Sequence, residues 1–152
     1  MVKAEASTTL NHTVEEVWNF ISDWKNFEKW FVLQPGEEIS KTSDGPIGLG
    51  STIRLKGRFL GNNMVVDSRV SEYEPNKRIG IEYISGSFKG STKTYIMEPE
   101  GDGQKTKLTH VSVGEFRGLW RIPGLILRFE AQRGLVRTNK EELDKLSTSI
   151  PG

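Results

Sequence analysis

The N-terminal segment contains the pattern that most restricts the fold of this chain. An extended run, Val2 to Leu10, is followed by Thr13 and Glu16, the spacing of a capping box, in which each residue satisfies a backbone N–H of the other. Apolar residues then recur at helical spacing up to Ile21, and a second short helical run, Asn26 to Trp30, follows. A strand followed at once by two short helices predicts helices that close one end of a curved sheet.

The middle of the chain alternates apolar and polar residues, which is typical of antiparallel strands with one solvated face. Within residues 52–60, apolar side chains alternate with Arg54, Lys56 and Arg58, which we expect on the solvated outer face. Turn signals such as Gly61-Asn62 separate the runs. The pattern predicts strands at residues 31–40, 52–60, 64–73, 79–83, 91–98 and 105–116.

The chain then becomes helical to its end, although Pro123-Gly124 interrupts the start of this helix. Five apolar residues fall on one stripe of it, namely Ile126, Phe129, Val136, Leu143 and Leu146. A helix with such a stripe must bury it, and the inward face of the sheet is the available partner. The predicted fold class is therefore α+β, with a long C-terminal helix against an antiparallel sheet.

Composition limits the classes of function. The 152 residues fit one domain, expected to span 1–152. A formal net charge of +1 argues against nucleic acid as the main partner, and the absence of cysteine excludes disulfides and thiolate metal sites. No apolar run reaches about 18 residues, so stable membrane insertion is not expected. Since Met1 to Glu5 shows no secretory pattern, we expect a cytoplasmic protein.

Motifs for cofactor or metal chemistry are weak, and we expect neither group. The glycine-rich loop Gly45 to Gly50 leads into a strand rather than a helix, so it does not fit a phosphate cradle and is better interpreted as a mobile loop beside a cavity. The only histidines, His12 and His110, lie far apart in the sequence, whereas zinc sites need three or four ligands. Ser112 shares a strand face with His110, but no orienting acid shares that face.

The order of motifs resembles the START-like superfamily, which includes the polyketide cyclase/dehydrase family and the birch-pollen-allergen-like proteins. The matching segments are Val17-Trp18, Asp23, Trp30, Gly45 to Ser51, Val70 to Pro75 with Arg78, Tyr95 to Pro99, Gly103 to Thr109 and the C-terminal helix. The resemblance implies a helix-grip fold, in which seven antiparallel strands curl round the long helix and leave a cavity. Its members bind lipids, sterols, quinones, hormones or polyketides; a minority catalyse cyclisation or dehydration, and others are chaperone-linked partner modules.

A pocket of this kind is lined mostly by apolar and aromatic side chains with few polar groups. The candidate ligand-binding residues are His110, Tyr95, Tyr83, Phe59, Met97, Trp120 and Phe129. Strand alternation places His110 with Leu108 on the inward face. It is either a histidine hydrogen-bonded within the core or a polar group that binds a ligand oxygen or acts as an acid/base.

The sequence therefore leads to three hypotheses of function. The first is a protein that binds or transports a small apolar or amphipathic molecule, such as a lipid, quinone, sterol or polyketide. The second is an enzyme of the cyclase/dehydratase kind that uses His110 and a tyrosine, and the third is a partner-binding module. Converging titratable groups in the pocket would favour the enzyme, one polar group the binder, and a filled interior the module. Ligand identity and oligomeric state are not indicated.

Overall fold

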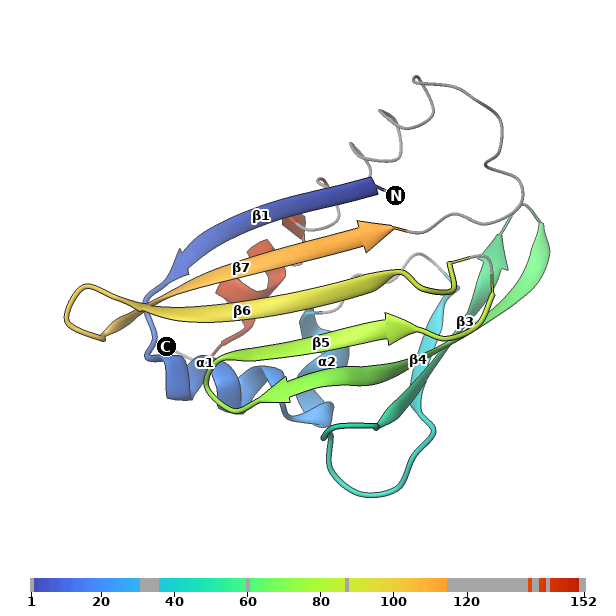
Figure 1. The fold of residues 1–152 in the computed structure, drawn as a ribbon, viewed down its shortest axis with the longest axis horizontal. Coiled ribbons are helices and arrows are strands. Elements are labelled where there is room, and N and C mark those ends of the chain that lie inside the picture. Colours follow the sequence, from blue (N-terminus) through green and yellow to red (C-terminus); the bar gives the residue numbers. More distant parts are fainter. Residues whose placement is uncertain are drawn as a thin grey trace.

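The structure of the chain is a computed structural model, and it describes residues 2–30, 36–59, 61–86, 88–114, 137, 140–141 and 143–150. Within these ranges, seven antiparallel strands form one sheet in the order β1-β7-β6-β5-β4-β3-β2 (Figure 1). Their bounds are β1 Val2–Leu10, β2 Glu38–Lys41, β3 Thr52–Phe59, β4 Asn62–Glu74, β5 Arg78–Tyr83, β6 Thr92–Glu100 and β7 Lys105–Gly114.

Hairpins explain most of this order. Each strand from β3 to β7 pairs with its predecessor in the sequence, and β1 pairs with β7 from Val2 opposite Gly114 to Leu10 opposite Thr106. The β4–β5 register shifts between Val70 and Glu72, an irregularity that increases local twist. The first strand thereby lies beside the last, so both ends of the chain's sheet-forming region meet.

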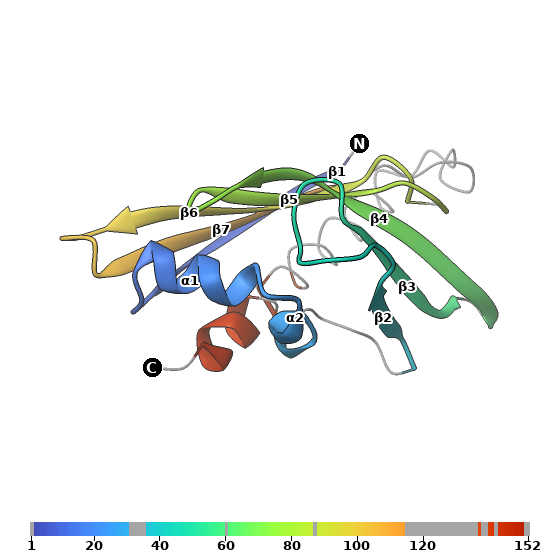
Figure 2. The same ribbon diagram turned by 90° about the horizontal axis from the view of Figure 1, so that it is seen from below.

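The helices lie together on one face of the sheet, as Figure 2 shows. They are α1 Val14–Ile21, α2 Trp24–Trp30 and a C-terminal helix whose described residues include 143–149. The face that they cover is called the inward face below. This is the α+β helix-grip arrangement that the sequence predicts.

The predicted start of α1 and its reciprocal capping box are confirmed. The backbone N–H of Glu16 donates to the hydroxyl oxygen of Thr13 over 3.2 Å. The Glu16 carboxylate in turn accepts from the backbone N–H and the hydroxyl of Thr13, and it also pairs with the His12 ring at 2.9 Å. The hydrogen bond with His12 lowers the pKa of Glu16.

Two predicted boundaries were wrong. Helix α2 begins at Trp24 rather than Asn26, because the Asp23 carboxylate accepts from the backbone N–H of Lys25 and starts the helix early. The strand expected at 31–40 is β2, which begins only at Glu38; Gly36 has a φ of 83°, which a strand cannot adopt. Residues 31–35, 115 and 116 lie outside the described part of the chain.

The core lies between the inward face and the helices. Leu143 and Leu146 of the predicted C-terminal stripe are 2% and 0% exposed and belong to the same buried cluster as strand residues such as Leu108. The stripe's other members, Ile126, Phe129 and Val136, lie outside the described residues. Trp30 at the end of α2 contacts Tyr95 of β6, with ring centroids 5.1 Å apart. The short helices therefore cover the sheet, as expected.

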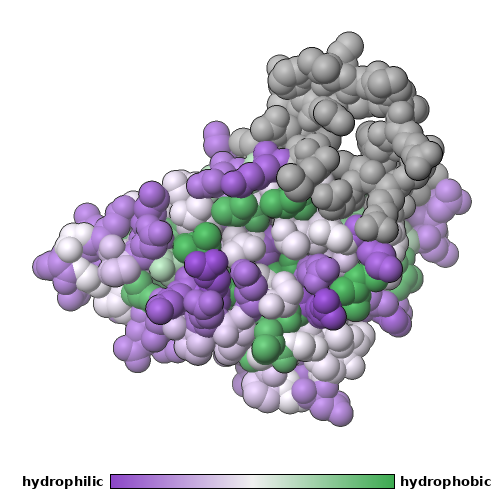
Figure 3. All heavy atoms as spheres, viewed as in Figure 1, coloured by the Kyte–Doolittle hydropathy of each residue, from purple (hydrophilic) through white to green (hydrophobic). Residues whose placement is uncertain are grey.

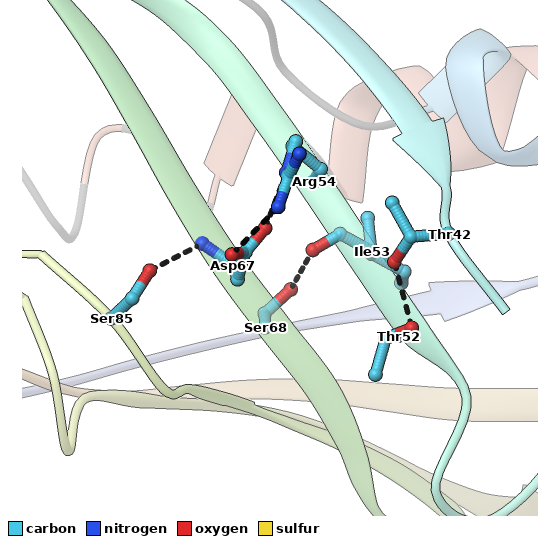
Figure 4. Close-up of polar contacts among 7 residues, drawn as sticks. All are labelled: Thr42, Thr52, Ile53, Arg54, Asp67, Ser68 and Ser85. Atoms are coloured by element: carbon cyan, nitrogen blue, oxygen red, sulfur yellow. Dashed lines mark hydrogen bonds and ion pairs between the residues drawn. The ribbon is translucent and has the colours of Figure 1, made fainter.

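The outer face of the sheet is polar and basic along β3, as predicted. Lys56 and Arg58 are exposed, and Arg54 donates two hydrogen bonds to Asp67 of β4, at 2.8 and 3.2 Å (Figure 4). The hydrogen bond from Arg54 lowers the pKa of the Asp67 carboxyl. In the space-filling view, hydrophilic residues surround small apolar patches on this side (Figure 3).

Candidate functional site

A cavity of about 310 Å³ opens on the inward face of the sheet. Most of its wall consists of inward side chains of β3 to β7 and the residues beside them. The described lining residues are Glu37, Leu55, Met64, Val66, Tyr83, Phe88, Ser91, Thr92, Lys93, Ser112, Val113 and Gly114. A much smaller void of about 10 Å³ shares Leu55, Tyr83 and Lys93 with it, so the two hollows adjoin. The wall is apolar over β3 and β4 and carries polar groups over β6 and β7.

Lys93 is the cationic residue among the described lining residues. It lies on β6 opposite Ile81 of β5 and Ser112 of β7, and its side chain is half-buried. Ser91, two residues earlier on the same side of the chain, is 5% exposed, and Ser112 is 2% exposed. Lys93, Ser91 and Ser112 thus form a polar region of the wall on β6 and β7.

Glu37 supplies the one carboxylate among the described lining residues, and it belongs to another part of the wall. Its side chain lies over Gly57 of β3, where a Cβ atom would come within 2.8 Å of the Glu37 Cγ. A side chain at this position would therefore have to displace the Glu37 side chain. In the sheet order, β4 and β5 separate β3 from β6, so Glu37 and Lys93 approach the cavity from different walls.

His110 lies beside the cavity on the inward face and is not among the described lining residues. Its ring stacks on Tyr95 with centroids 4.3 Å apart and an interplanar angle of 21°, and both residues are 0% exposed. The Nε2 atom of His110 is 3.4 Å from the hydroxyl oxygen of Ser112, which does line the cavity. The inward position of His110 is as predicted, and its link to the cavity runs through Ser112.

The predicted site residues therefore divide into three groups. Tyr83 lines the cavity, whereas Tyr95, His110 and Met97 are buried on the same inward face farther along β6 and β7, with Met97 4% exposed. The side chain of Phe59, at the end of β3, lies outside the described part of the structure, as do Trp120 and Phe129.

Sequence reasoning missed Lys93 and Glu37. The signal for Lys93 was present, since it precedes Tyr95 and Met97 by two and four residues and so shares their strand face. Glu37 gave no such signal. It was assigned to the strand predicted at 31–40, but that strand, β2, begins only at Glu38.

The glycine-rich loop is held to the sheet in this structure. The backbone N–H of Gly50 donates to the carbonyl of Val70, and Ser51 accepts from the N–H of Val70 in return. Ile47 is buried in the core, and none of residues 44–51 is among the described lining residues of the cavity. The expected position of this loop beside a cavity therefore has no support from the described lining residues.

The described residues contain neither a metal-binding cluster nor a membrane-spanning helix. Within the described ranges, no group of three or more histidine, aspartate or glutamate side chains could hold a metal ion. No helix among the described residues is long and apolar enough to cross a membrane.

Comparison with known proteins gave a match to one family and several to solved structures. A family model described as "Polyketide cyclase / dehydrase and lipid transport" matches residues 1–150. Protein TTHA0849 from Thermus thermophilus is 17% identical with a TM-score of 0.76, over 97% of this chain and 96% of that chain. A START superfamily protein from Mycobacterium smegmatis is 16% identical with a TM-score of 0.68, over 97% and 96%.

A third solved structure is the di-domain ARO/CYC BexL from the BE-7585A biosynthetic pathway. It is 19% identical with a TM-score of 0.70, over 99% of this chain and 46% of that chain. At these identities the likeness concerns the fold, which agrees with the predicted helix-grip fold. No curated protein matches the sequence.

Proposed function

The chain belongs to the polyketide cyclase/dehydrase and lipid transport family, and we propose that it binds or transports a small apolar or amphipathic molecule. The ligand class is a lipid, quinone, sterol or polyketide-like molecule, held between the sheet and the C-terminal helix. The observation that supports this proposal is the cavity of about 310 Å³ on the inward face. Pockets for small molecules begin at roughly this size.

The chemistry of the wall supports an apolar ligand. Leu55, Met64, Val66 and Phe88 line the cavity, and placing apolar surface against them removes it from water. A hollow of this size also argues against the partner-module hypothesis, which requires a filled interior. The neighbouring polar groups would fix the orientation of one end of an amphipathic ligand.

The test is ligand-dependent stabilisation, measured as a melting temperature against fatty acids, quinones, sterols and aromatic polyketides. A ligand that binds only the folded state at about 100 times its Kd stabilises it by roughly 2.7 kcal/mol. Native mass spectrometry of the same samples should show a one-to-one complex. If no member of the panel stabilises the protein, the proposal is wrong.

A pair of neighbouring substitutions provides the control. Met64 lines the cavity, whereas Val65, the next residue of β4, is 49% exposed on the outer face. Met64→Trp should fill part of the hollow and weaken binding, while Val65→Trp should bind like the wild type. Equal affinities for the two variants would show that the ligand lies elsewhere.

We propose that His110 contributes by holding Ser112 at the wall. Replacing it in His110→Leu removes a partner of a buried hydroxyl, which should cost about 1–3 kcal/mol of unfolding free energy. If Ser112 contacts the ligand, affinity should fall as well. A variant that loses stability but binds with unchanged affinity would assign His110 to the core alone.

The second candidate is an enzyme of the cyclase/dehydratase kind. It is favoured by three titratable residues that line the cavity, namely Glu37, Tyr83 and Lys93. Such groups can transfer protons to a bound carbonyl compound. Incubation with a linear polyketide, followed by mass spectrometry, separates the two candidates. Conversion to a product lighter by one water indicates catalysis, and recovery of the unchanged compound from the complex indicates binding.

A further inference from the structure

We infer that the ligand carries one anionic group of the carboxylate kind and that Lys93 binds it. This inference rests on the proposed binding function and narrows its ligand class.

The position of Lys93 is the first observation. Residues 91, 93, 95 and 97, on β6 and just before it, point to the same side of the sheet, and three of them are almost fully buried: Ser91 is 5%, Tyr95 0% and Met97 4% exposed. Strand β6 lies inside the sheet, between β5 and β7. Lys93 is half-buried at an inward position of this interior strand, and its side chain lines the cavity.

The cost of filling the cavity is the second consideration. An apolar ligand would displace water from around the Lys93 ammonium, and the loss of hydration of a charge is unfavourable unless polar contacts replace it. A carboxylate on the ligand replaces that hydration. The ammonium has three N–H donors, so it can bind the ligand while it keeps a contact within the protein. The cavity therefore discriminates against neutral ligands of the same shape.

The surrounding hydroxyl groups fit the same anion. Ser112 lies opposite Lys93 on β7, and Tyr83 of β5 is the register neighbour of Ser91, since the N–H of Tyr83 donates to the Ser91 carbonyl. Residues with a hydroxyl group therefore occupy the strand positions beside Lys93 on β7 and at the adjoining ends of β5 and β6. A carboxylate has two oxygens that accept several hydrogen bonds, so it can use the lysine and a neighbouring hydroxyl together.

The Glu37 carboxylate disfavours a second anionic group on the ligand. Glu37 lies over Gly57 of β3, whereas Lys93 belongs to β6, so the two charged residues enter the cavity from different strands. A second anionic group at the Glu37 end would meet a like charge, which is unfavourable. The anionic end therefore lies at β6 and the apolar part extends toward β3 and β4.

The test compares decanoic acid with decanol by titration calorimetry at neutral pH, because the two share a chain and differ in charge. The wild type should bind decanoate at least about 10-fold more tightly. Lys93→Met should lower decanoate affinity by a similar factor and leave decanol affinity unchanged or higher. Lys93→Arg should keep the preference, and Lys107→Met, at an exposed lysine on β7, should match the wild type.

The outcomes separate this inference from the proposed function. Equal binding of both probes by the wild type, or a preference retained in Lys93→Met, overturns the role of Lys93 while cavity binding stands. If neither probe binds, this inference is overturned, and the melting-temperature panel decides separately whether the binding proposal stands. If Lys93→Met does not fold, the measurement is repeated with Lys93→Gln. The preference of the wild type for decanoate over decanol is measured without any variant.

Discussion

Replacing Leu146 with alanine should strongly destabilise the protein, because this leucine anchors the C-terminal helix. Leu146 is 0% exposed and belongs to the buried cluster that includes Leu108 of β7. Leu146→Ala deletes three carbon atoms, which is about 2.4 kcal/mol at roughly 0.8 kcal/mol per buried methylene. A cavity that does not collapse adds about 1–2 kcal/mol, so we expect a loss of about 3–4 kcal/mol of unfolding free energy.

The assay is urea denaturation followed by circular dichroism and by tryptophan fluorescence, since the two probes should give one transition if folding is two-state. Glu141→Ala is the matched control, because Glu141 is exposed on the same helix and its loss should change stability by less than about 0.5 kcal/mol. A loss below about 1 kcal/mol for Leu146→Ala would refute the docking of this helix on the sheet.

Three further perturbations test local features. Thr13→Ala removes the hydroxyl that caps α1, and the unfolding free energy should fall by about 1 kcal/mol in urea denaturation. Because Arg54 lowers the folded-state pKa of Asp67, the pair's stabilisation is present above about pH 4, the carboxyl's pKa when unfolded, and is lost as pH falls through the lowered value. Asp67→Asn should remove this part of the pH dependence, and an unchanged stability–pH curve would contradict it. Gly57→Ala should displace Glu37 and lower the melting temperature; a variant as stable as the wild type would show that the glutamate moves freely.

Local chemistry was sufficient to predict much of the fold. Thr13 identifies the start of α1 because its hydroxyl satisfies a backbone N–H that the helix itself cannot satisfy. Alternation along β7 places Leu108 and His110 on one face because successive strand side chains point to opposite sides. Where a local interaction was overlooked, as with the Asp23 carboxylate before α2, the predicted boundary was displaced.

The candidate site depended on contacts between distant parts of the chain. The sequence determined by itself that His110 faces inward, and the same strand period was sufficient to place Lys93 on the face of Tyr95, although that signal was missed. Only the tertiary structure decided that Lys93 lines a cavity while His110 contacts Ser112 beside it, and that Glu37 lies over Gly57. The physical reason is that alternation assigns a residue to a face, whereas register between strands and the distance to the covering helices decide whether that residue meets packed side chains or open space.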